Sequence, residues 1–390
     1  MKKAVELSAG ASTQSRARRP IPPGWDAVAV SRAGCQEVWD VATADGRHFH
    51  HPIACTWVFD QGGPVLGYRD HVLRVPMGPM GVVDVYERDA AYLLGDIVGP
   101  YLKPDSLGVR FMANGSDACD AAVRVARAAT GRDHIVSVGY HGSSVVFVHP
   151  PQDEGVPAVF STHRRDVGFG DTGVLDDALF EVADDLAAII VEVPSTDELA
   201  CSFLRHCREA CDAEGALLIL DEVVTGFRLA LGGAAEHYGV APDIACYGKA
   251  MANGRPIAAV VGPQAEMAAL ADRVFYSNTY NGDPFHCALA LLTMRELRGS
   301  EERVYSHLWD IGNTLKGELN ARGIPVVGHA PRTALAIPDE AKRREFCWRM
   351  VEKGIMMDRP NYASMAHGDR HVRWTVQFAE EVLEEMGGLA

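Results

Sequence analysis

The chain has 390 residues, of which 47% are hydrophobic and 23% are charged. This composition excludes an intrinsically disordered protein and allows a large domain together with a smaller one. The 37 basic side chains against 52 acidic ones give a formal net charge of −15, which argues against a nucleic-acid-binding protein and gives no reason to expect affinity for anionic membranes. No run approaches the roughly 18 apolar residues of a membrane-spanning helix.

The N-terminal residues 1–24 contain basic side chains but no apolar stretch of the kind found in a secretory signal. We therefore expect a flexible tail and a cytoplasmic protein. Two short strands are predicted within residues 37–49, on either side of the turn Ala44-Asp45-Gly46. We expect residues 25–60 to contribute to the smaller domain.

From about residue 86, helical patterns alternate with short apolar runs that show little polar alternation, as in strands buried on both faces. We predict an α/β fold with a mostly parallel central sheet flanked by helices in a large domain at 61–285. A smaller α+β domain at 286–390 is expected, with a strand near 325–327. The apolar runs are Val109–Met112, His134–Val138, Ala188–Val193, Ala216–Leu220, Ile244–Tyr247 and Ile257–Val261.

The nine cysteines include no CxxC pair. Cys207 and Cys211 are four residues apart, which places them on one face of a predicted helix. We interpret the cysteines as small buried hydrophobic residues of a reducing cytosol, and not as metal ligands or disulfides.

Ligands of a parallel sheet bind beyond the carboxyl ends of its strands. Gly115, Ser116 and Asp117 follow the first run and begin a helix, where free backbone N–H groups and the helix dipole can bind an anion. The alternative is an ordinary helix cap by Ser116. Tyr140 follows the second run, where an aromatic side chain can stack on a planar ligand or simply be half-buried in a turn.

Asp221 ends the run at 216–220, and burial there requires a cationic or hydrogen-bonding partner, either a protonated ring nitrogen or Arg228. Lys249 follows the run at 244–247. It is the only lysine between Lys103 and Lys316, and it lies among small and apolar residues. Such a lysine either forms an imine or extends its amine to solvent.

Four features are therefore expected at one edge of the sheet: an anion-binding loop, a stacking aromatic side chain, a desolvated carboxylate and an isolated lysine. Together they are typical of a site for a phosphorylated, cationic aromatic aldehyde. Pyridoxal 5'-phosphate (PLP) fits each of these features.

The segments that carry these residues resemble the class III aminotransferases, within the fold type I PLP enzymes. They are FMANGSDACDAAVRVARAATGRDHI, GYHG, LLILDEVVTGFRLALGGAAEHYGVAPDIACYGKAMANGRPIAAVVG and SMAHGDRHV. The similarity runs from about residue 35 to the end and is nearest to the branch related to glutamate-1-semialdehyde aminomutase. The stretch from DEVVTGFR to GKAMANG, with its internal spacing, is the most specific part.

The resemblance implies that Lys249 forms the Schiff base with PLP and later carries a proton, and that Asp221 keeps the ring nitrogen protonated. It implies that Thr279 reaches the phosphate of the neighbouring subunit, so that a homodimer shares two sites. The other residues implied to bind the cofactor hold its phosphate, cover its ring faces or lie at its ring edge: Gly115, Ser116, Asp117, Tyr140, His141, Val223 and Glu192.

The sequence departs from the family pattern at several positions. Residues 193–197, after Glu192, contain no glycine, and Asp283 replaces the usual asparagine before Pro284. The pair His50-His51 stands where an aspartate is common. Because these neighbours on a strand point to opposite faces, we expect no shared metal ion there.

The implied activity is transfer of an amino group from a donor, glutamate being plausible, to a carbonyl substrate that is sugar-like or belongs to specialised metabolism. A carboxylate substrate needs an arginine; Arg359, Arg370 and Arg373 are candidates, but none falls on a motif position. Another PLP reaction remains the alternative: an aminomutase, a racemase or epimerase, or an enzyme that forms or breaks a C–C bond. A non-catalytic scaffold or sensor is the alternative from another class.

Overall fold

The structure is a computed structural model that describes residues 83–151, 153–193, 200–357 and 360–389, together with Val58 and three short N-terminal strands. The predicted tail at 1–24 lies outside these residues. The chain divides into two compact units, one of Thr56–Tyr305 and the other of Ser306–Ala390 with Met1–Cys55. None of the described helices combines the length and the apolar character needed to cross a lipid bilayer.

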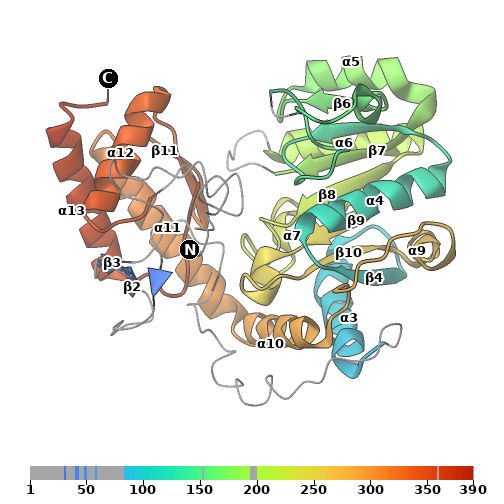
Figure 1. Cartoon of the computed structure of the whole chain (residues 1–390), viewed down its shortest axis with the longest axis horizontal. Coiled ribbons are helices and arrows are strands. Elements are labelled where there is room, and N and C mark those ends of the chain that lie inside the picture. Colours follow the sequence, from blue (N-terminus) through green and yellow to red (C-terminus); the bar gives the residue numbers. More distant parts are fainter. Residues whose placement is uncertain are drawn as a thin grey trace, which may run out of the picture. The chain divides into compact units, whose positions relative to one another are not determined.

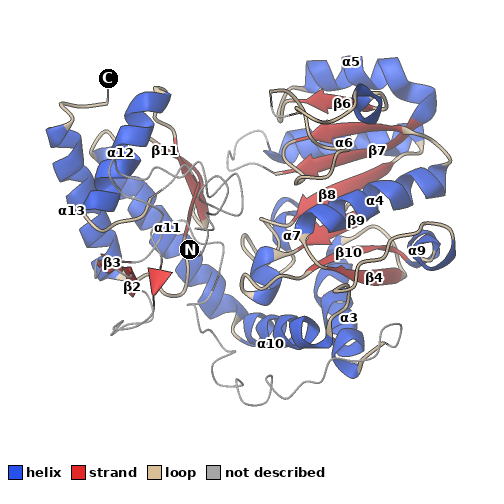
Figure 2. Ribbon diagram, in the orientation of Figure 1, coloured by secondary structure: helices blue, strands red, loops and turns tan. Residues whose placement is uncertain are grey.

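The larger unit is built on a seven-stranded sheet, with the strand order β4-β10-β9-β8-β7-β5-β6 (Figures 1 and 2). Only β10 is antiparallel to its neighbours in this sheet, so the other strands all run in one direction and end at one edge. The strands are β4 Leu107–Met112, β5 His134–Val138, β6 Arg164–Val167, β7 Leu186–Glu192, β8 Leu217–Glu222, β9 Ile244–Tyr247 and β10 Ala258–Pro263.

Helices cover both faces of this sheet, which confirms the predicted α/β class. One face packs against α4 Gly115–Thr130, α8 Gln264–Met267 and α9 Ala269–Asp272. The other face packs against α5 Thr172–Val182, α6 Ala200–Glu214 and α7 Gly233–Tyr238. The unit also contains α3 Val85–Val98, α10 Pro284–Gly299, and the 3-10 helices η3 Gly99–Tyr101, η4 Ala158–Ser161, η5 Ala183–Asp185 and η6 Lys249–Ala252.

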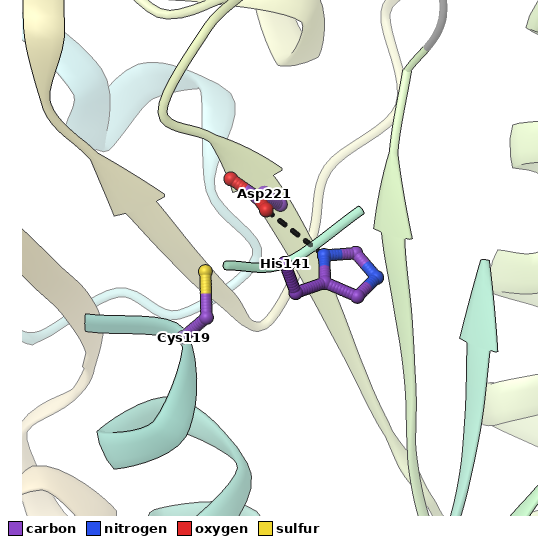
Figure 3. A group of neighbouring side chains, drawn as sticks. All are labelled: Cys119, His141 and Asp221. Atoms are coloured by element: carbon purple, nitrogen blue, oxygen red, sulfur yellow. Dashed lines mark hydrogen bonds and ion pairs between the residues drawn. The ribbon is translucent and has the colours of Figure 1, made fainter. Parts of the chain in front are cut away.

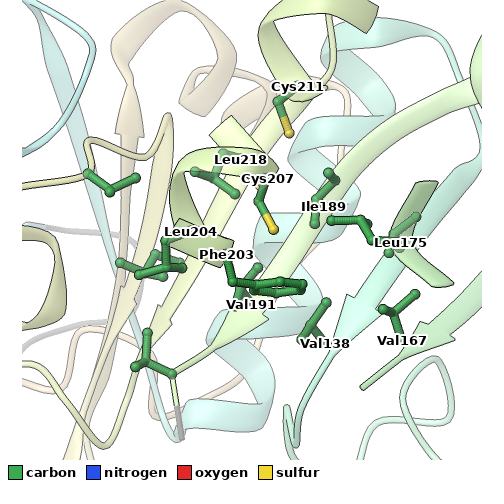
Figure 4. Packing of buried hydrophobic residues seen from close by; sticks show 14 of the residues in the cluster. Val138, Val167, Leu175, Ile189, Val191, Phe203, Leu204, Cys207, Cys211 and Leu218 are labelled. Atoms are coloured by element: carbon green, nitrogen blue, oxygen red, sulfur yellow. The ribbon is translucent and has the colours of Figure 1, made fainter. Parts of the chain in front are cut away.

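The alternation of side chains along β7 shows why its sequence is continuously apolar. Ile189 and Val191 belong to the cluster with α6, whereas Ala188 and Ile190 belong to the cluster with α4. Successive residues of a strand point to opposite faces, so a strand between two helical layers buries both sets. The α6 cluster includes Phe203, Cys207 and Cys211, and Figure 4 shows their side chains directed toward the sheet. These cysteines are buried on the predicted helix, and both have free thiols.

The strands at His134–Val138 and Ile244–Tyr247 have the predicted bounds, and the other four predicted apolar runs coincide with strands to within two residues at each end. The two strands predicted within residues 37–49 are β2 Asp40–Thr43 and β3 His48–His50, which pair antiparallel; β1 Val30–Ser31 pairs with β2.

The described C-terminal elements consist of long helices and a small antiparallel sheet with the order β11-β12-β13. The strand expected near residues 325–327 is β11. The elements are α11 Glu301–Ala321, β11 Val326–His329, β12 Arg332–Leu335, α12 Glu340–Glu352, β13 Pro360–Tyr362 and α13 Asp369–Glu385.

Candidate functional site

The residues singled out in the sequence gather at the carboxyl edge of the parallel strands. Glu192, at the end of β7, is aligned with Asp221 near the end of β8, and Asp221 is aligned with Cys246 on β9. The loop after β5 and the first turn of α4 lie at the same edge, because Gly142 and Ser116 approach each other closely. The parallel topology therefore brings together side chains from five separate segments.

Asp221 is the buried anion of this edge, with 3% of its surface exposed. Its Oδ2 lies 2.9 Å from Nδ1 of His141, and its Oδ1 accepts a hydrogen bond of 3.1 Å from the backbone N–H of Val223 (Figure 3). Burial alone would raise the pKa of Asp221. Interactions with His141, led by the hydrogen bond, and the positive charge of Lys249 outweigh this effect and hold the pKa of Asp221 below its ordinary value.

His141 is the partner that the sequence did not identify for Asp221. The alternative candidate, Arg228, is buried as well, but the Asp221 carboxylate hydrogen-bonds with His141, with the N–H of Val223 and with the thiol of Cys119. Nε2 of His141 is buried without a hydrogen-bond partner among the described residues. An imidazole that carries its single proton on Nδ1 and donates it to Asp221 leaves the carboxylate ionised and Nε2 uncharged.

The first turn of α4 contacts the loop after β5. The cap of this helix is Asn114 and not Ser116, since Asn114 Oδ1 accepts from the N–H of Asp117 at 3.0 Å. Ser116 instead accepts a hydrogen bond of 3.1 Å from the N–H of Ser143 in the loop after β5. Asp117 is held by Asn114, whose Nδ2 donates to the Asp117 carboxylate at 3.0 Å.

Two glycines allow this close approach. Gly142 has φ +98°, and a Cβ at this position would lie 2.7 Å from Cβ and 2.9 Å from Cα of Ser116. A Cβ on Gly115 would lie 2.8 Å from Cγ1 of Val223. Real carbon atoms do not approach so closely, so only glycine allows the two loops and Val223 to meet here.

Tyr140 and Glu192 are joined through the backbone. The N–H of Tyr140 donates to Oε2 of Glu192 at 3.2 Å, and the ring of Tyr140 is 70% exposed. Gly139, with φ +101°, packs against the Glu192 side chain. The end of β7 thereby fixes the position of the tyrosine that follows β5, and leaves its ring open to the edge of the sheet.

Lys249 follows β9 after a single residue, Gly248, and begins the short helix η6. Its backbone is in the left-handed region, with φ +40°, which is uncommon for a residue with a side chain. The residues after it, Ala250, Met251 and Ala252, are buried, whereas Lys249 itself is half-buried. Its charge acts on Asp221, so the amine and the carboxylate share one electrostatic environment.

Thr279 lies in the turn before α10 and is exposed. The same turn is joined to the segment between β4 and α4 of its own chain, because Asn281 Oδ1 accepts a hydrogen bond of 3.0 Å from the N–H of Ala113. Phe275 and Tyr280, on either side of Thr279, are 84% and 63% exposed.

One side chain near Asp221, that of Cys119, was not recognised as part of a site from the sequence. Cys119 of α4 places its sulfur near Asp221 and His141, and it interacts with Cys246 of β9. The available signal was the spacing, because Cys119 lies three residues after Ser116 and so on the same face of α4. The neighbouring Glu222, by contrast, is structural. It accepts hydrogen bonds from Thr225 and from the N–H groups of Ala234 and Ala235 at the start of α7.

The sequence model of the family Aminotransferase class-III matches residues 172–366, which include β8, β9 and Lys249. This is half of the chain. The protein belongs to the class-III aminotransferase family.

Solved structures with the same fold as this aminotransferase cover most of the chain. The Sphingopyxis sp. MTA144 FumI protein, in its PLP internal aldimine form, has 24% identity, a TM-score of 0.82 and coverage of 94% of this chain and 91% of its own. An omega-transaminase from Sphaerobacter thermophilus has 21% identity, a TM-score of 0.83 and coverage of 95% and 93%. A β-phenylalanine aminotransferase from Variovorax paradoxus has 20% identity, a TM-score of 0.80 and coverage of 94% and 89%.

Pyridoxal phosphate is the cofactor of this aminotransferase, and the described residues fit it. Ser116 lies in the first turn of α4, where free backbone N–H groups can bind an anionic phosphate, and the glycine at position 142 keeps any side chain of the loop after β5 away from it. The buried, ionised Asp221 needs a cationic partner, which a protonated ring nitrogen supplies.

Proposed function

We propose that Lys249 and Asp221 are the catalytic residues of this aminotransferase. The observation that supports this proposal is the buried Asp221 carboxylate at the carboxyl edge of the sheet, with the Lys249 amine in its electrostatic field and His141 bonded to it. A buried carboxylate with a perturbed pKa in such a position is typical of a functional site.

Bound PLP supplies an aldehyde that captures amines and a ring that accepts electrons from the substrate. The role of Asp221 is to keep a negative charge beside the ring nitrogen, and the hydrogen bonds from His141 and Val223 fix the direction of that charge. Nζ of Lys249 is the group that we propose to remove and return the proton at Cα of the substrate. Its position just after β9 keeps it at the edge where Asp221 lies.

The remaining residues position the cofactor. Gly115 and Ser116, with the N-terminal N–H groups of α4, are proposed to bind the phosphate, with Asp117 tied back by Asn114. Tyr140 is proposed to cover one ring face and Val223 the other. For Glu192 the proposed place is the ring edge, supported by its hydrogen bond with the backbone of Tyr140.

We propose a homodimer in which Thr279 reaches the phosphate of the neighbouring subunit. The support is the exposure of Thr279 between Phe275 and Tyr280, because two large aromatic side chains in solvent mark an interaction surface. Within its own chain the turn is already fixed by Asn281, so the threonine is presented on an ordered segment.

For the substrates we propose an amino donor such as glutamate and a sugar-like or specialised carbonyl acceptor, on the sequence resemblance alone. The proposed location is the cytoplasm, which is supported by seven free cysteines among the described residues.

The first experiment locates the covalent attachment of the cofactor. Borohydride treatment of the PLP-loaded protein, followed by peptide mapping, should place a pyridoxyl group on Lys249. Lys103 is the matched control, because its amine is 50% exposed and paired with Asp212 at 2.5 Å. A label on other lysines, with Lys249 unmodified, contradicts the proposal.

The second experiment separates amino transfer from the other PLP reactions. PLP-loaded protein is mixed with one amino donor at a time and no acceptor, and the keto product is quantified by mass spectrometry. Amino transfer should release one equivalent of keto acid per subunit and then stop. A racemase would yield the opposite enantiomer of the donor without keto acid, and that result would overturn the proposed reaction.

A further inference from the structure

Cys119, His141 and Asp221 form a compact cluster with three different donor atoms. They come from α4, from the loop after β5 and from the end of β8, and their exposed fractions are 1%, 2% and 3%. One sulfur, one ring nitrogen and one carboxylate oxygen all lie within 4.8 Å of one another. Figure 3 shows the Cys119 sulfur on one side of Asp221 and the His141 ring on the other.

We propose that, in the absence of PLP, Cys119, His141 and Asp221 bind a Zn²⁺ ion, and that Zn²⁺ and PLP exclude each other from this protein. Three atoms no more than 4.8 Å apart have a common point within about 2.8 Å of each, that is 4.8 Å divided by √3. Zinc binds sulfur at about 2.3 Å and nitrogen or oxygen at about 2.0–2.2 Å, so inward shifts of at most about 0.5–0.8 Å bring the three donor atoms to bonding distance.

The chemistry of the donors selects this metal. Thiolate, imidazole and carboxylate together are ligands of zinc, whereas calcium and magnesium are bound by oxygen donors. A neutral imidazole with one thiolate and one carboxylate carries two negative charges, so the site with Zn²⁺ is neutral overall. Neutrality matters here because an unpaired charge at a fully buried position is strongly unfavourable.

Binding releases one proton. The contact with Cys246, burial and the charge of Asp221 all raise the pKa of Cys119, so the thiol is protonated without metal. Zinc replaces the proton on sulfur, and the proton passes to solvent. Zinc also binds the Asp221 carboxylate and Nδ1 of His141, so the imidazole proton moves from Nδ1 to Nε2.

The mutual exclusion rests on the proposed function of Asp221 as the partner of the ring nitrogen. The negative charge of a carboxylate that ligates Zn²⁺ is neutralised by the metal ion. A cationic ring nitrogen at the same place would be repelled by Zn²⁺. Cofactor and metal therefore compete for one side chain. The amine of Lys249 and the phosphate pocket at Ser116 are not required for the metal.

A second group of potential metal ligands must be removed before the number of Zn²⁺ ions bound per chain is measured. His134, His163 and Asp185 also place donor atoms within 4.8 Å of one another. They lie at the amino ends of β5, β6 and β7, which is the opposite edge of the sheet, and are more exposed. The variant His163→Ala breaks this group, and all measurements use it as the background.

The test titrates the full-length His163→Ala protein, freed of PLP, with Zn²⁺ by calorimetry and with Co²⁺ by absorption spectroscopy. We expect one ion per chain and a cobalt–sulfur absorption band. Cys119→Ala should weaken binding at least a hundredfold and remove the band. Cys211→Ala, which deletes an equally buried thiol in the other core cluster, should change the affinity less than twofold.

The competition is measured separately, by titrating PLP at several Zn²⁺ concentrations. We expect the apparent Kd for PLP to rise in proportion to Zn²⁺ above the Kd for zinc, and PLP-saturated protein to take up no ion at this site. Absence of binding, or binding that survives Cys119→Ala, overturns the metal site but leaves the role of Asp221 intact. Binding that is lost in Cys119→Ala but does not affect PLP overturns the exclusion and the placement of Asp221 at the ring.

Discussion

Gly142→Ala is the most direct perturbation of the proposed phosphate pocket. The new Cβ would lie 2.7 Å from Cβ and 2.9 Å from Cα of Ser116, and closer still to its hydroxyl. Rotation of the serine side chain relieves only the contact with the hydroxyl, so the two backbone segments must separate. The hydrogen bond from the N–H of Ser143 to Ser116, 3.1 Å in the native protein, would be lost with them.

The expected effect on cofactor binding follows from the charged hydrogen bond that Ser116 would no longer make. Hydrogen bonds to charged groups contribute about 1.5–3 kcal/mol, which corresponds to an increase of about 10- to 150-fold in the Kd for PLP. The positive φ of +98° adds about 1–2 kcal/mol of strain to the folded state whether or not PLP is bound.

Gly155→Ala separates these two contributions. Gly155 has φ +83° but no heavy atom within 4 Å of an added Cβ, so alanine there introduces backbone strain without a clash. Each PLP-free variant is titrated with PLP, and the quenching of tryptophan fluorescence gives the Kd. We expect Gly155→Ala to bind like the native protein. An unchanged Kd in Gly142→Ala, with both variants folded by thermal melting, would refute the assignment of this pocket to the phosphate.

Three further outcomes are expected. Burial raises the pKa of Glu222 from 4.5 to about 7, so between these pH values the folded protein holds a proton that the unfolded chain releases. The free energy of unfolding should then fall by up to about 3 kcal/mol as pH rises from 4.5 to 7, and Glu222→Gln should flatten this decline in urea titrations. Asp221→Asn should reduce kcat/KM about 10²- to 10³-fold, and unchanged kinetics would contradict its role. Phe203→Ala should lower the free energy of unfolding by about 3–5 kcal/mol but leave the Kd for PLP unaltered, because Phe203 belongs to the core cluster with α6.

The sheet could be predicted where its strands are apolar runs, including β4 at one edge, and it could not at the other edge, where β6 lies. β6 was not predicted, because its sequence Arg164-Arg165-Asp166-Val167 contains three charged residues and no apolar run. The strand forms because β5 pairs with it and because the Arg164 guanidinium is buried, donating to the carbonyl of Val148 at 3.1 Å. This hydrogen bond of the Arg164 side chain is to the carbonyl of Val148, which lies outside the strand. A local sequence pattern cannot identify such a partner.

The candidate site shows the same limit at the level of single residues. Asp221 and Lys249 stood out because each follows an apolar strand, and the strands appear where the pattern placed them. The sequence offered two partners for Asp221, a protonated ring nitrogen or Arg228 in the same motif. In the structure a side-chain partner of this carboxylate is His141, which lies 80 residues earlier. β7 separates β5 from β8 in the sheet. Only the order of the strands brings the two side chains together, and the order cannot be derived from the length of the runs.

The geometry of α4 explains why one helix matters both to the phosphate pocket and to Asp221. Ser116 and Cys119 are three residues apart and share a face, and each residue advances about 1.5 Å along the helix axis. Asn114 caps the helix and the Ser143 N–H fixes the position of Ser116. Together they place the side chain at position 119 near Asp221. A small, uncharged thiol is tolerated against the carboxylate, whereas an acidic side chain would repel it and a basic one would compete for its charge. The residue at position 119 is therefore a determinant of how strongly Asp221 can attract a cation, although the family resemblance assigned it no role.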